Sequence, residues 1–194
     1  KQRLSSVFVT SISADGCRLS GAVTKLSTDT LASSGGWSPV IHLSCHTGSR
    51  PVWSDELGGF LAGRTVQQQL TAGGINGHYQ TKTVLQEGVN AALHALNQLG
   101  LAAVEVILPQ TETVRQGPSM TLFQIPHSKP TSQAPKQFVD FQTDVTAASI
   151  EIACREGFAS IEHIKRYTAM GFGTDQGKLG NVNGMAVAAK ALRR

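Results

Sequence analysis

The sequence contains no long apolar run and no cluster of positive charge. No stretch of about eighteen apolar residues occurs, so neither a membrane-spanning helix nor a secretory leader is expected. Lysine and arginine total 17 of the 194 residues and are dispersed, apart from Lys165-Arg166 and Arg193-Arg194. A nucleic-acid groove needs clustered basic residues with aromatics between them. We therefore expect a soluble, globular chain that binds neither nucleic acid nor membrane.

The chain also has few potential metal ligands. Its three cysteines are scattered and form no C-x-x-C pair, at Cys17, Cys45 and Cys154. This usage predicts reduced thiols in a cytoplasmic protein, and their individual roles stay open. His42 and His46, with Asp55-Glu56, fit no ligand spacing. We predict no metal site.

The first part of the chain has the pattern of short antiparallel strands. Apolar and β-branched runs over residues 4–12, 17–26 and 29–34 predict two or three strands, with a tight turn at Asp15-Gly16. The third run leads into residues 34–39, where Gly36 and Pro39 mark a loop that can approach a ligand closely. A simple strand-end turn is the alternative. Residues 40–46 are expected to be helical or irregular, and 51–57 a surface excursion.

A glycine-rich turn precedes the strongest predicted helix. Residues 66–72 are a strand candidate and lead into Gly73, Gly74, Ile75, Asn76 and Gly77. An apolar stripe then follows helical spacing, at Val84, Leu85, Val89, Leu93 and Leu96, and Gly100 ends the helix. A strand, a glycine turn and a helix together present backbone N–H groups to an anion such as a dinucleotide phosphate. Such turns also serve only to pack helix against sheet.

The second half changes composition at about residue 108. Five prolines fall within residues 108–136, which predicts a mostly irregular connection with a strand-like stretch at 121–125. A segment held by a partner is the alternative. Beyond it, Thr146 and Ser160 are predicted to cap two helices, which end near residues 156 and 168. Asn181 or Asn183 is predicted to cap a third helix over 184–192. The fold class expected is α+β, with a small three-helix domain at the end.

Several separated motifs resemble one family in the same order along the chain. They are residues 34–43 (SGGWSPVIHL), 51–56 (PVWSDE), 72–77 (AGGING) and 157–178, followed by Asn181-Val-Asn-Gly184. These stretches closely resemble the alpha subunit of bacterial heterotetrameric sarcosine oxidase, and the resemblance covers essentially the whole chain. The opening Lys1-Gln2-Arg3 then suggests an internal piece of a longer polypeptide.

The resemblance implies a domain plan. Residues 1–107 would be the C-terminal part of a dinucleotide-binding, pyridine nucleotide-disulfide oxidoreductase-like domain that binds NAD, with Gly36, Pro39, Gly73, Gly74, Asn76 and Gly77 at the cofactor. Residues 108–136 would be a connection, and 137–194 a small helical domain. Related flavoproteins carry Asp where this chain has Gly74, which favours NAD over FAD. FAD and tetrahydrofolate would bind only elsewhere in the parent complex.

The final domain also resembles small 2Fe–2S domains. Their four cysteine positions fall on Asp140, Gln142, Asp175 and Gly180, and Cys154 does not replace them. Because such clusters are held by thiolates, this site is expected to be rebuilt around side-chain hydrogen bonds.

The loop Thr174-Asp175-Gln176-Gly177-Lys178 is the remaining candidate site. In the resembled family, FMN lies between the alpha and beta subunits and is attached to beta. A glycine turn with a hydroxyl, an amide and an ammonium suits a phosphate or a polar flavin edge. We predict that Thr174, Gln176, Gly177, Lys178 and Asn181 contact FMN. The alternative is a purely structural knot.

The function implied is that of a sarcosine oxidase subunit, which demethylates sarcosine oxidatively to glycine. Its partners would be the beta subunit and small gamma and delta subunits. No residue is a candidate for the amine-oxidising base, so we assign no catalytic residue, and the substrate could be another secondary amine. The alternative function is a non-catalytic interaction module of an amine-oxidising complex.

Overall fold

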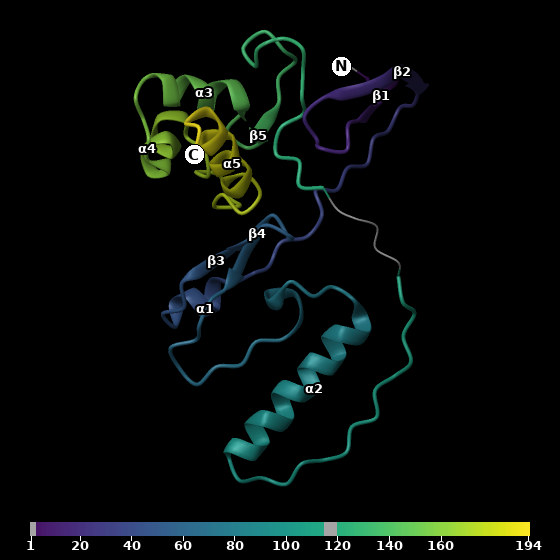
Figure 1. The fold of residues 1–194 in the computed structure, drawn as a ribbon, viewed down its shortest axis with the longest axis vertical. Helices are drawn as coiled ribbons and strands as arrows, with labels where there is room; N and C mark the ends of the chain where they lie inside the picture. The colour runs from purple at the N-terminus through teal and green to yellow at the C-terminus, as the bar shows by residue number, and fades with distance from the viewer. Residues whose placement is uncertain (1–2, 115–119) are drawn as a thin grey trace. The chain divides into compact units, whose positions relative to one another are not determined.

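The computed structural model describes residues 3–114 and 120–194 (Figure 1). They form two compact units: Ser34–Thr121 is one, and Lys1–Ser33 together with Leu122–Arg194 is the other. Helices occur alongside three two-stranded sheets, each antiparallel, so the α+β class is confirmed for the described residues. The dinucleotide-binding assignment and the domain boundaries at 107 and 136 stay predictions.

A β-hairpin opens the chain. β1 (Ser6–Ile12) pairs with β2 (Leu19–Ser27), which confirms the first two predicted strands. The Asp15 carboxylate accepts the Cys17 N–H at 3.0 Å, and Gly16 has φ +68°. The third predicted strand, 29–34, is wrong. The Thr28 hydroxyl bonds the Thr30 carbonyl at 2.7 Å, and this local turn diverts the chain from the sheet.

The unit Ser34–Thr121 contains a second hairpin that the sequence did not reveal. α1 (His42–His46) is followed by β3 (Pro51–Ser54) and β4 (Gly59–Ala62), so the predicted surface excursion is half of a hairpin. The strand predicted at 66–72 is also wrong. Its backbone has no strand partner, and the Gln69 side chain instead bonds the hydroxyls of Ser44 and Thr47.

The predicted long helix is confirmed. η1 (Gly73–Asn76), a 3₁₀ turn, leads into α2 (Thr81–Gln98), and Gly100 follows with φ +68°. Val84 of its apolar stripe lies against Gly73, where an added Cβ would be 3.0 Å from the Val84 Cγ1. Neither α2 nor any other helix in the described part of the chain is long and apolar enough to cross a membrane.

The described residues of segment 108–136 carry neither helix nor strand, as predicted for the segment as a whole. The strand-like stretch predicted at 121–125 is wrong, because its backbone pairs with no strand. Pro118 lies outside the described residues. Gln137 explains how this segment is held without a strand partner. Its side chain accepts the Ile125 N–H at 2.8 Å and donates to the Ile125 carbonyl at 2.9 Å, which imitates a backbone pair.

The C-terminal helices share one buried core. β5 (Phe138–Asp140) and β6 (Val145–Thr146) precede α3 (Ala147–Arg155), α4 (Ile161–Thr168) and α5 (Asn181–Ala191) (Figure 1). The buried apolar residues found in the described chain all lie here: Val139, Val145, Ala147, Ile150, Ala153, Ile164, Met170, Val187 and Ala188.

The helix ends follow local chemistry. Thr146 caps α3 in a reciprocal capping box with Ser149, as the sequence predicted for Thr146. Ser160 precedes α4 but makes no side-chain cap bond. α5 begins three residues before the predicted Gly184, because the Asn181 N–H already bonds the Gly177 carbonyl at 2.9 Å.

Gly184 is where the core meets α5 most closely. A Cβ added there would lie 2.1 Å from the Met170 Sδ, and Met170 is fully buried. In α2, by contrast, a Cβ added at Gly88 meets nothing within 4 Å. The two glycines therefore differ in packing while both interrupt a helix.

We expect Gly184→Ala to lower the free energy of unfolding by about 1–3 kcal/mol, because the added methyl group would displace the buried Met170 side chain from its packing. The matched change Gly88→Ala is expected to raise it by about 0.5–1 kcal/mol, because alanine favours the helix. Urea unfolding followed by circular dichroism measures both. Stabilisation by Gly184→Ala would show that this contact is not tight.

Candidate functional site

The loop before α5 is held by the buried carboxylate of Asp140, which is 4% exposed. One oxygen accepts the Gly171 N–H at 2.8 Å, and the other accepts the N–H groups of Gln142 at 2.9 Å and Thr143 at 3.3 Å. Burial alone would raise the pKa of Asp140, but the three backbone N–H groups outweigh it and hold the pKa below its ordinary value. Asp140 is therefore an ionised structural anchor.

Gln142 makes the second tie to the same loop. Its side-chain oxygen accepts the Thr174 N–H at 2.5 Å and the Thr174 hydroxyl at 3.0 Å. A Cβ added at Gly173 would lie 2.1 Å from that oxygen, so the close approach requires glycine. Asp140 and Gln142 thus fix both ends of the segment 171–174.

The four positions aligned with cluster cysteines make a hydrogen-bonded structure instead. Asp175 accepts the N–H groups of Gly177 and Leu179 at 3.3 and 3.2 Å, and a Cβ added at Gly180 would lie 3.5 Å from that of Asp140. These bonds, with those of Gln142, agree with the predicted rebuilding. Within residues 3–114 and 120–194, no three His, Cys, Asp or Glu side chains gather as a metal site.

Asn181 fills the centre of the loop. Its amide group lies where a Cβ added at Gly171 or Gly177 would come within 2.5 or 2.1 Å, and both glycines have positive φ. The Asn181 Oδ1 atom is buried without a hydrogen-bond partner among the described residues. Asn181 is thus placed inside the loop, where it packs against both glycines.

The other predicted FMN residues divide into two groups. Thr174 is engaged by Gln142, and Gly177 is buried. The side chains of Gln176 and Lys178 are exposed and make no hydrogen bond or ion pair with any described residue. The ammonium of Lys178 is consequently the charged group that the loop offers to an external partner.

The glycine turn before α2 belongs to the other unit. Gly77 has φ +79° and closes η1, and a Cβ added to it would lie 2.3 Å from Leu57 and 3.3 Å from Leu61. The turn is thus packed directly on the side chains around the β3–β4 hairpin. Gly73 and Gly77, which both have positive φ, therefore have a structural requirement that is independent of any ligand.

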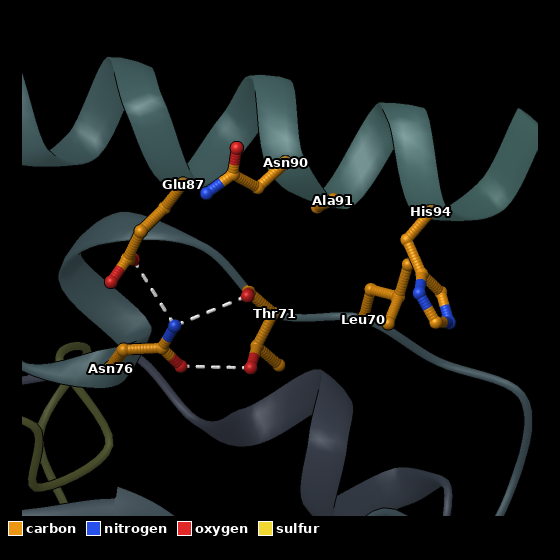
Figure 2. A pocket seen from close by; sticks show the side chains of 7 residues that line it. All are labelled: Leu70, Thr71, Asn76, Glu87, Asn90, Ala91 and His94. Carbon is orange, nitrogen blue, oxygen red and sulfur yellow. Dashed lines mark hydrogen bonds between the residues drawn. The ribbon is translucent and has the colours of Figure 1, made fainter. Parts of the chain in front are cut away.

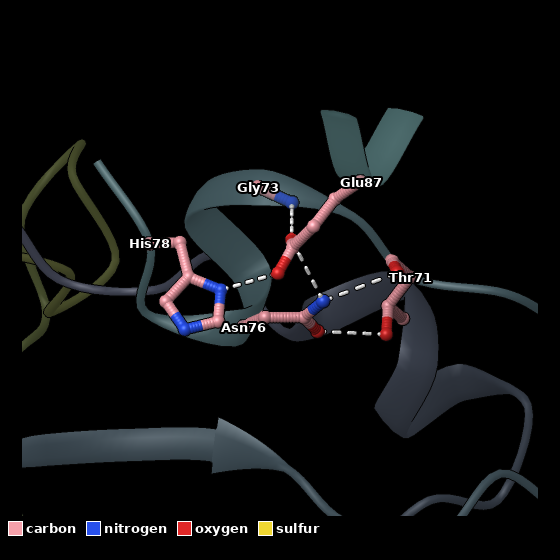
Figure 3. A network of polar contacts seen from close by, with 5 residues as sticks. All are labelled: Thr71, Gly73, Asn76, His78 and Glu87. Carbon is pink, nitrogen blue, oxygen red and sulfur yellow. Dashed lines mark hydrogen bonds and ion pairs between the residues drawn. The ribbon is translucent and has the colours of Figure 1, made fainter. Parts of the chain in front are cut away.

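The turn's first backbone donor is occupied by Glu87 of α2 (Figure 3). The Glu87 Oε2 atom accepts the Gly73 N–H at 2.6 Å and the Asn76 Nδ2 at 3.2 Å, while Oε1 pairs with the His78 Nδ1. Asn76 also bonds both the hydroxyl and the carbonyl of Thr71. The Gly73 N–H above all holds the pKa of Glu87 below its ordinary value, with further help from Asn76 and His78.

The predicted loop at 36–39 reaches the same turn through aromatic residues. The Trp37 ring lies 6.3 Å from that of Tyr79, which packs beside Gly74, where an added Cβ would be 3.4 Å from the Tyr79 ring. Pro39 lies beside Gly59. Gly36 is exposed, and a Cβ added there would meet no other described atom within 4 Å. The structure therefore brings this loop and the glycine turn together, but not Gly36 itself.

Sequence reasoning missed Glu87, Asn90 and His94. They lie at positions i, i+3 and i+7 of α2, on a face that lines a pocket of about 280 Å³ with Leu70, Thr71, Asn76 and Ala91 (Figure 2). A second period of polar residues, beside the apolar stripe used to find the helix, was the available signal.

Comparison with known proteins agrees with the motifs. Residues 134–194 match the family described as the sarcosine oxidase A3 domain. The chain is 40% identical over 173 residues to sarcosine oxidase subunit alpha of Rhizobium meliloti (strain 1021), covering 88% of this chain and 17% of that protein. It is 30% identical over 191 residues to the subunit alpha of Corynebacterium sp. (strain P-1), covering 97% and 19%. The chain belongs to the sarcosine oxidase alpha-subunit family.

The relatives are much longer than this chain. It spans about a fifth of their length, and the same holds for the subunit alpha of Corynebacterium sp. (strain U-96), which is 31% identical over 191 residues. Each relative is named as a subunit, so those proteins belong to multi-subunit oxidases. The A3 match falls on the helical unit that contains Asp140 and Lys178.

Asp140→Asn is expected to destabilise the helical unit by about 1–3 kcal/mol at neutral pH, because an amide replaces an ionised acceptor of three N–H groups. The depressed pKa stabilises the native state fully above the ordinary value of 3.8, and this contribution is lost as pH falls through the lower native pKa. The variant should therefore lose less stability on acidification than the unmodified chain.

Thermal unfolding is measured from neutral pH down to about pH 3, which lies in the range where Asp titrates. These measurements give both the loss of stability at neutral pH and its change on acidification. Asp144→Asn is the matched control. Asp144 lies in the same β5–β6 turn at φ 55°, which asparagine accepts, and its side chain makes no hydrogen bond among the described residues. Equal behaviour of the two variants would contradict the anchoring role of Asp140.

Proposed function

We propose that this chain works as part of the alpha subunit of a sarcosine oxidase-like flavoenzyme, which converts sarcosine oxidatively to glycine. The observation that carries the proposal is the 40% identity to a sarcosine oxidase alpha subunit over 88% of the chain. In this proposal the chain supplies no amine-oxidising base. It contributes to cofactor binding and to docking of the beta subunit.

The helical unit would contact FMN through the loop 174–181. FMN supplies one- and two-electron redox chemistry when bound. Lys178 supports this assignment, because its ammonium is exposed and unpaired among the described residues, and an ammonium is a common phosphate ligand. Gln176 adds an exposed amide beside it. Thr174, Gly177 and Asn181 would hold the loop in shape, in keeping with their internal contacts.

NAD is the ligand proposed for the unit Ser34–Thr121. The support is the glycine turn at Gly73, Gly74, Asn76 and Gly77, with the loop of Gly36 and Pro39 drawn near through Trp37 and Tyr79. The Gly73 N–H is already bonded to Glu87, so this amide is not the first choice for a cofactor phosphate. FAD and tetrahydrofolate would bind elsewhere in the complex.

Exposed apolar residues support the docking role. Phe141, Phe172 and Leu179 are 76%, 62% and 73% exposed, and they belong to the segments tied together by Asp140 and Gln142. Apolar groups of this size at a polar loop are typical of an interface that a partner covers. The same observation favours the second candidate function, a non-catalytic interaction module that binds no cofactor.

Calorimetric titration of the chain with NAD, FAD and FMN distinguishes the two candidates. Cofactor contribution predicts micromolar-range binding of NAD or FMN, whereas the interaction module predicts no binding of any of the three.

The FMN assignment makes a sharper prediction in an assembled oxidase. In the Rhizobium meliloti alpha subunit, the segment that aligns with this chain is replaced by this chain. The resulting alpha subunit is produced together with its partner subunits. Because FMN is expected to be attached to beta, Lys178→Met should act on electron transfer through the flavin and lower it about tenfold or more, the usual size of a lost charged hydrogen bond. Flavin absorbance and sarcosine-dependent oxygen uptake are the readouts.

Lys129→Met is the matched control, because Lys129 is also exposed and its ammonium makes no hydrogen bond or ion pair with any described residue. It should leave both readouts unchanged. Unchanged FMN content and electron transfer in Lys178→Met would refute the assignment, provided that the subunits still assemble.

A further inference from the structure

The face of α2 next to the glycine turn is polar where it meets the rest of its unit. Glu87, Asn90 and His94 follow one another along this face, opposite Leu70 and Thr71, and line the pocket of about 280 Å³ (Figure 2). Glu87 is half-buried, whereas Asn90 and His94 are exposed at the mouth of the pocket. Their side chains are therefore accessible to a ligand that enters the pocket and can form hydrogen bonds with it.

Glu87 determines the charge of this pocket. Its two oxygens receive three bonds, from Gly73, Asn76 and His78, which leaves one acceptor direction on the carboxylate (Figure 3). The carboxylate therefore occupies the place at the glycine turn that an anionic ligand would take. A phosphate in the pocket would have to displace it or lie beside its negative charge.

The other polar groups of the pocket are available. The Asn90 Oδ1 atom accepts from Gln86 at 3.0 Å, but its Nδ2 and both ring nitrogens of His94 bond no described residue. The pocket thus offers an amide donor, an imidazole that both donates and accepts, and one carboxylate acceptor. Neighbouring hydroxyl groups on one ligand match this set, because each hydroxyl donates and accepts.

We propose that this pocket binds a neutral, hydroxyl-bearing ligand with a vicinal diol, such as the ribose of a nucleoside, and that Glu87 excludes a phosphate from it. The ribose reading rests on the proposed nucleotide binding by the same unit. It places the sugar along Glu87, Asn90 and His94, and it places the phosphates of a dinucleotide away from Gly73.

Calorimetric titration of the chain with adenosine and AMP tests the proposal. Adenosine should bind up to about fivefold more tightly than AMP, because one partly exposed charge repulsion is worth up to about 1 kcal/mol. Glu87→Gln should reduce this preference and improve AMP binding. Asn90→Leu should weaken adenosine binding without a change in the Glu87 bonds to the turn.

Glu105→Gln is the matched charge control, because Glu105 is exposed in the same unit and makes no hydrogen bond in the described chain. It should leave the ratio of the two affinities unchanged. Circular dichroism establishes that each variant is folded. If Glu87→Gln does not fold, the proposal is tested by two remaining measurements. These are the ratio of the adenosine and AMP affinities of the unmodified chain, and the effect of Asn90→Leu on adenosine binding.

The proposal fails if AMP binds as tightly as adenosine, if neither binds, or if Asn90→Leu leaves adenosine binding unchanged. A parallel titration with NAD separates this result from the proposed function. NAD binding that is indifferent to Glu87→Gln and Asn90→Leu overturns the ribose site and keeps the NAD proposal. Adenosine binding without NAD binding keeps the ribose site and overturns the NAD proposal.

Discussion

The geometry of the C-terminal loop depends on the carboxylate of Asp140. Its bond to the Gly171 N–H joins β5 to a segment 31 residues further along the chain, and its bonds to Gln142 and Thr143 shape the β5–β6 turn. A buried carboxylate is costly unless its charge is met by hydrogen bonds, and here three backbone groups supply them. Gln142 then fixes Thr174 in the orientation that Asp140 has set. The exposed positions of Gln176 and Lys178 follow from these internal ties.

Glu87 uses the same chemistry in the other unit. A glycine turn leaves backbone N–H groups without intrahelical partners, and such groups require an acceptor. An external phosphate or a metal cluster can organise such a loop, but here an aspartate and a glutamate from the chain itself do so. A glycine-rich turn is therefore weak evidence for a ligand in this chain. Groups at the two candidate sites that bond no described residue are better evidence: the Gln176 amide and Lys178 ammonium in one unit, and the Asn90 Nδ2 and the His94 ring in the other.

The sequence predicted features that depend on neighbouring residues. The Asp15-Gly16 turn, the Thr146 cap and the apolar stripe of α2 are set within a few positions, and all are confirmed. Features that depend on distant partners were missed. β4 exists because it pairs with β3, residues 66–72 lack a strand partner, and Glu87 bonds a glycine fourteen positions earlier. Local propensity carries no information on which partner a backbone group finds across the unit. The loop 174–178 was located by its composition, but its internal bonds were not.

The division between bonded and unbonded groups also bears on the role proposed for this chain. Asp140 and Asp175 accept backbone N–H groups, and Glu87 is bonded by one backbone N–H and two side chains. These carboxylates are poor candidates for proton transfer, because each would have to give up several hydrogen bonds to become a base. Around the loop the exposed groups are a lysine, an amide and large apolar side chains. A surface of that composition suits a cofactor phosphate and a partner subunit better than bond-breaking chemistry. The hydrogen bonds of these carboxylates and the family relationship both favour the proposed role, a support for redox chemistry performed by other residues.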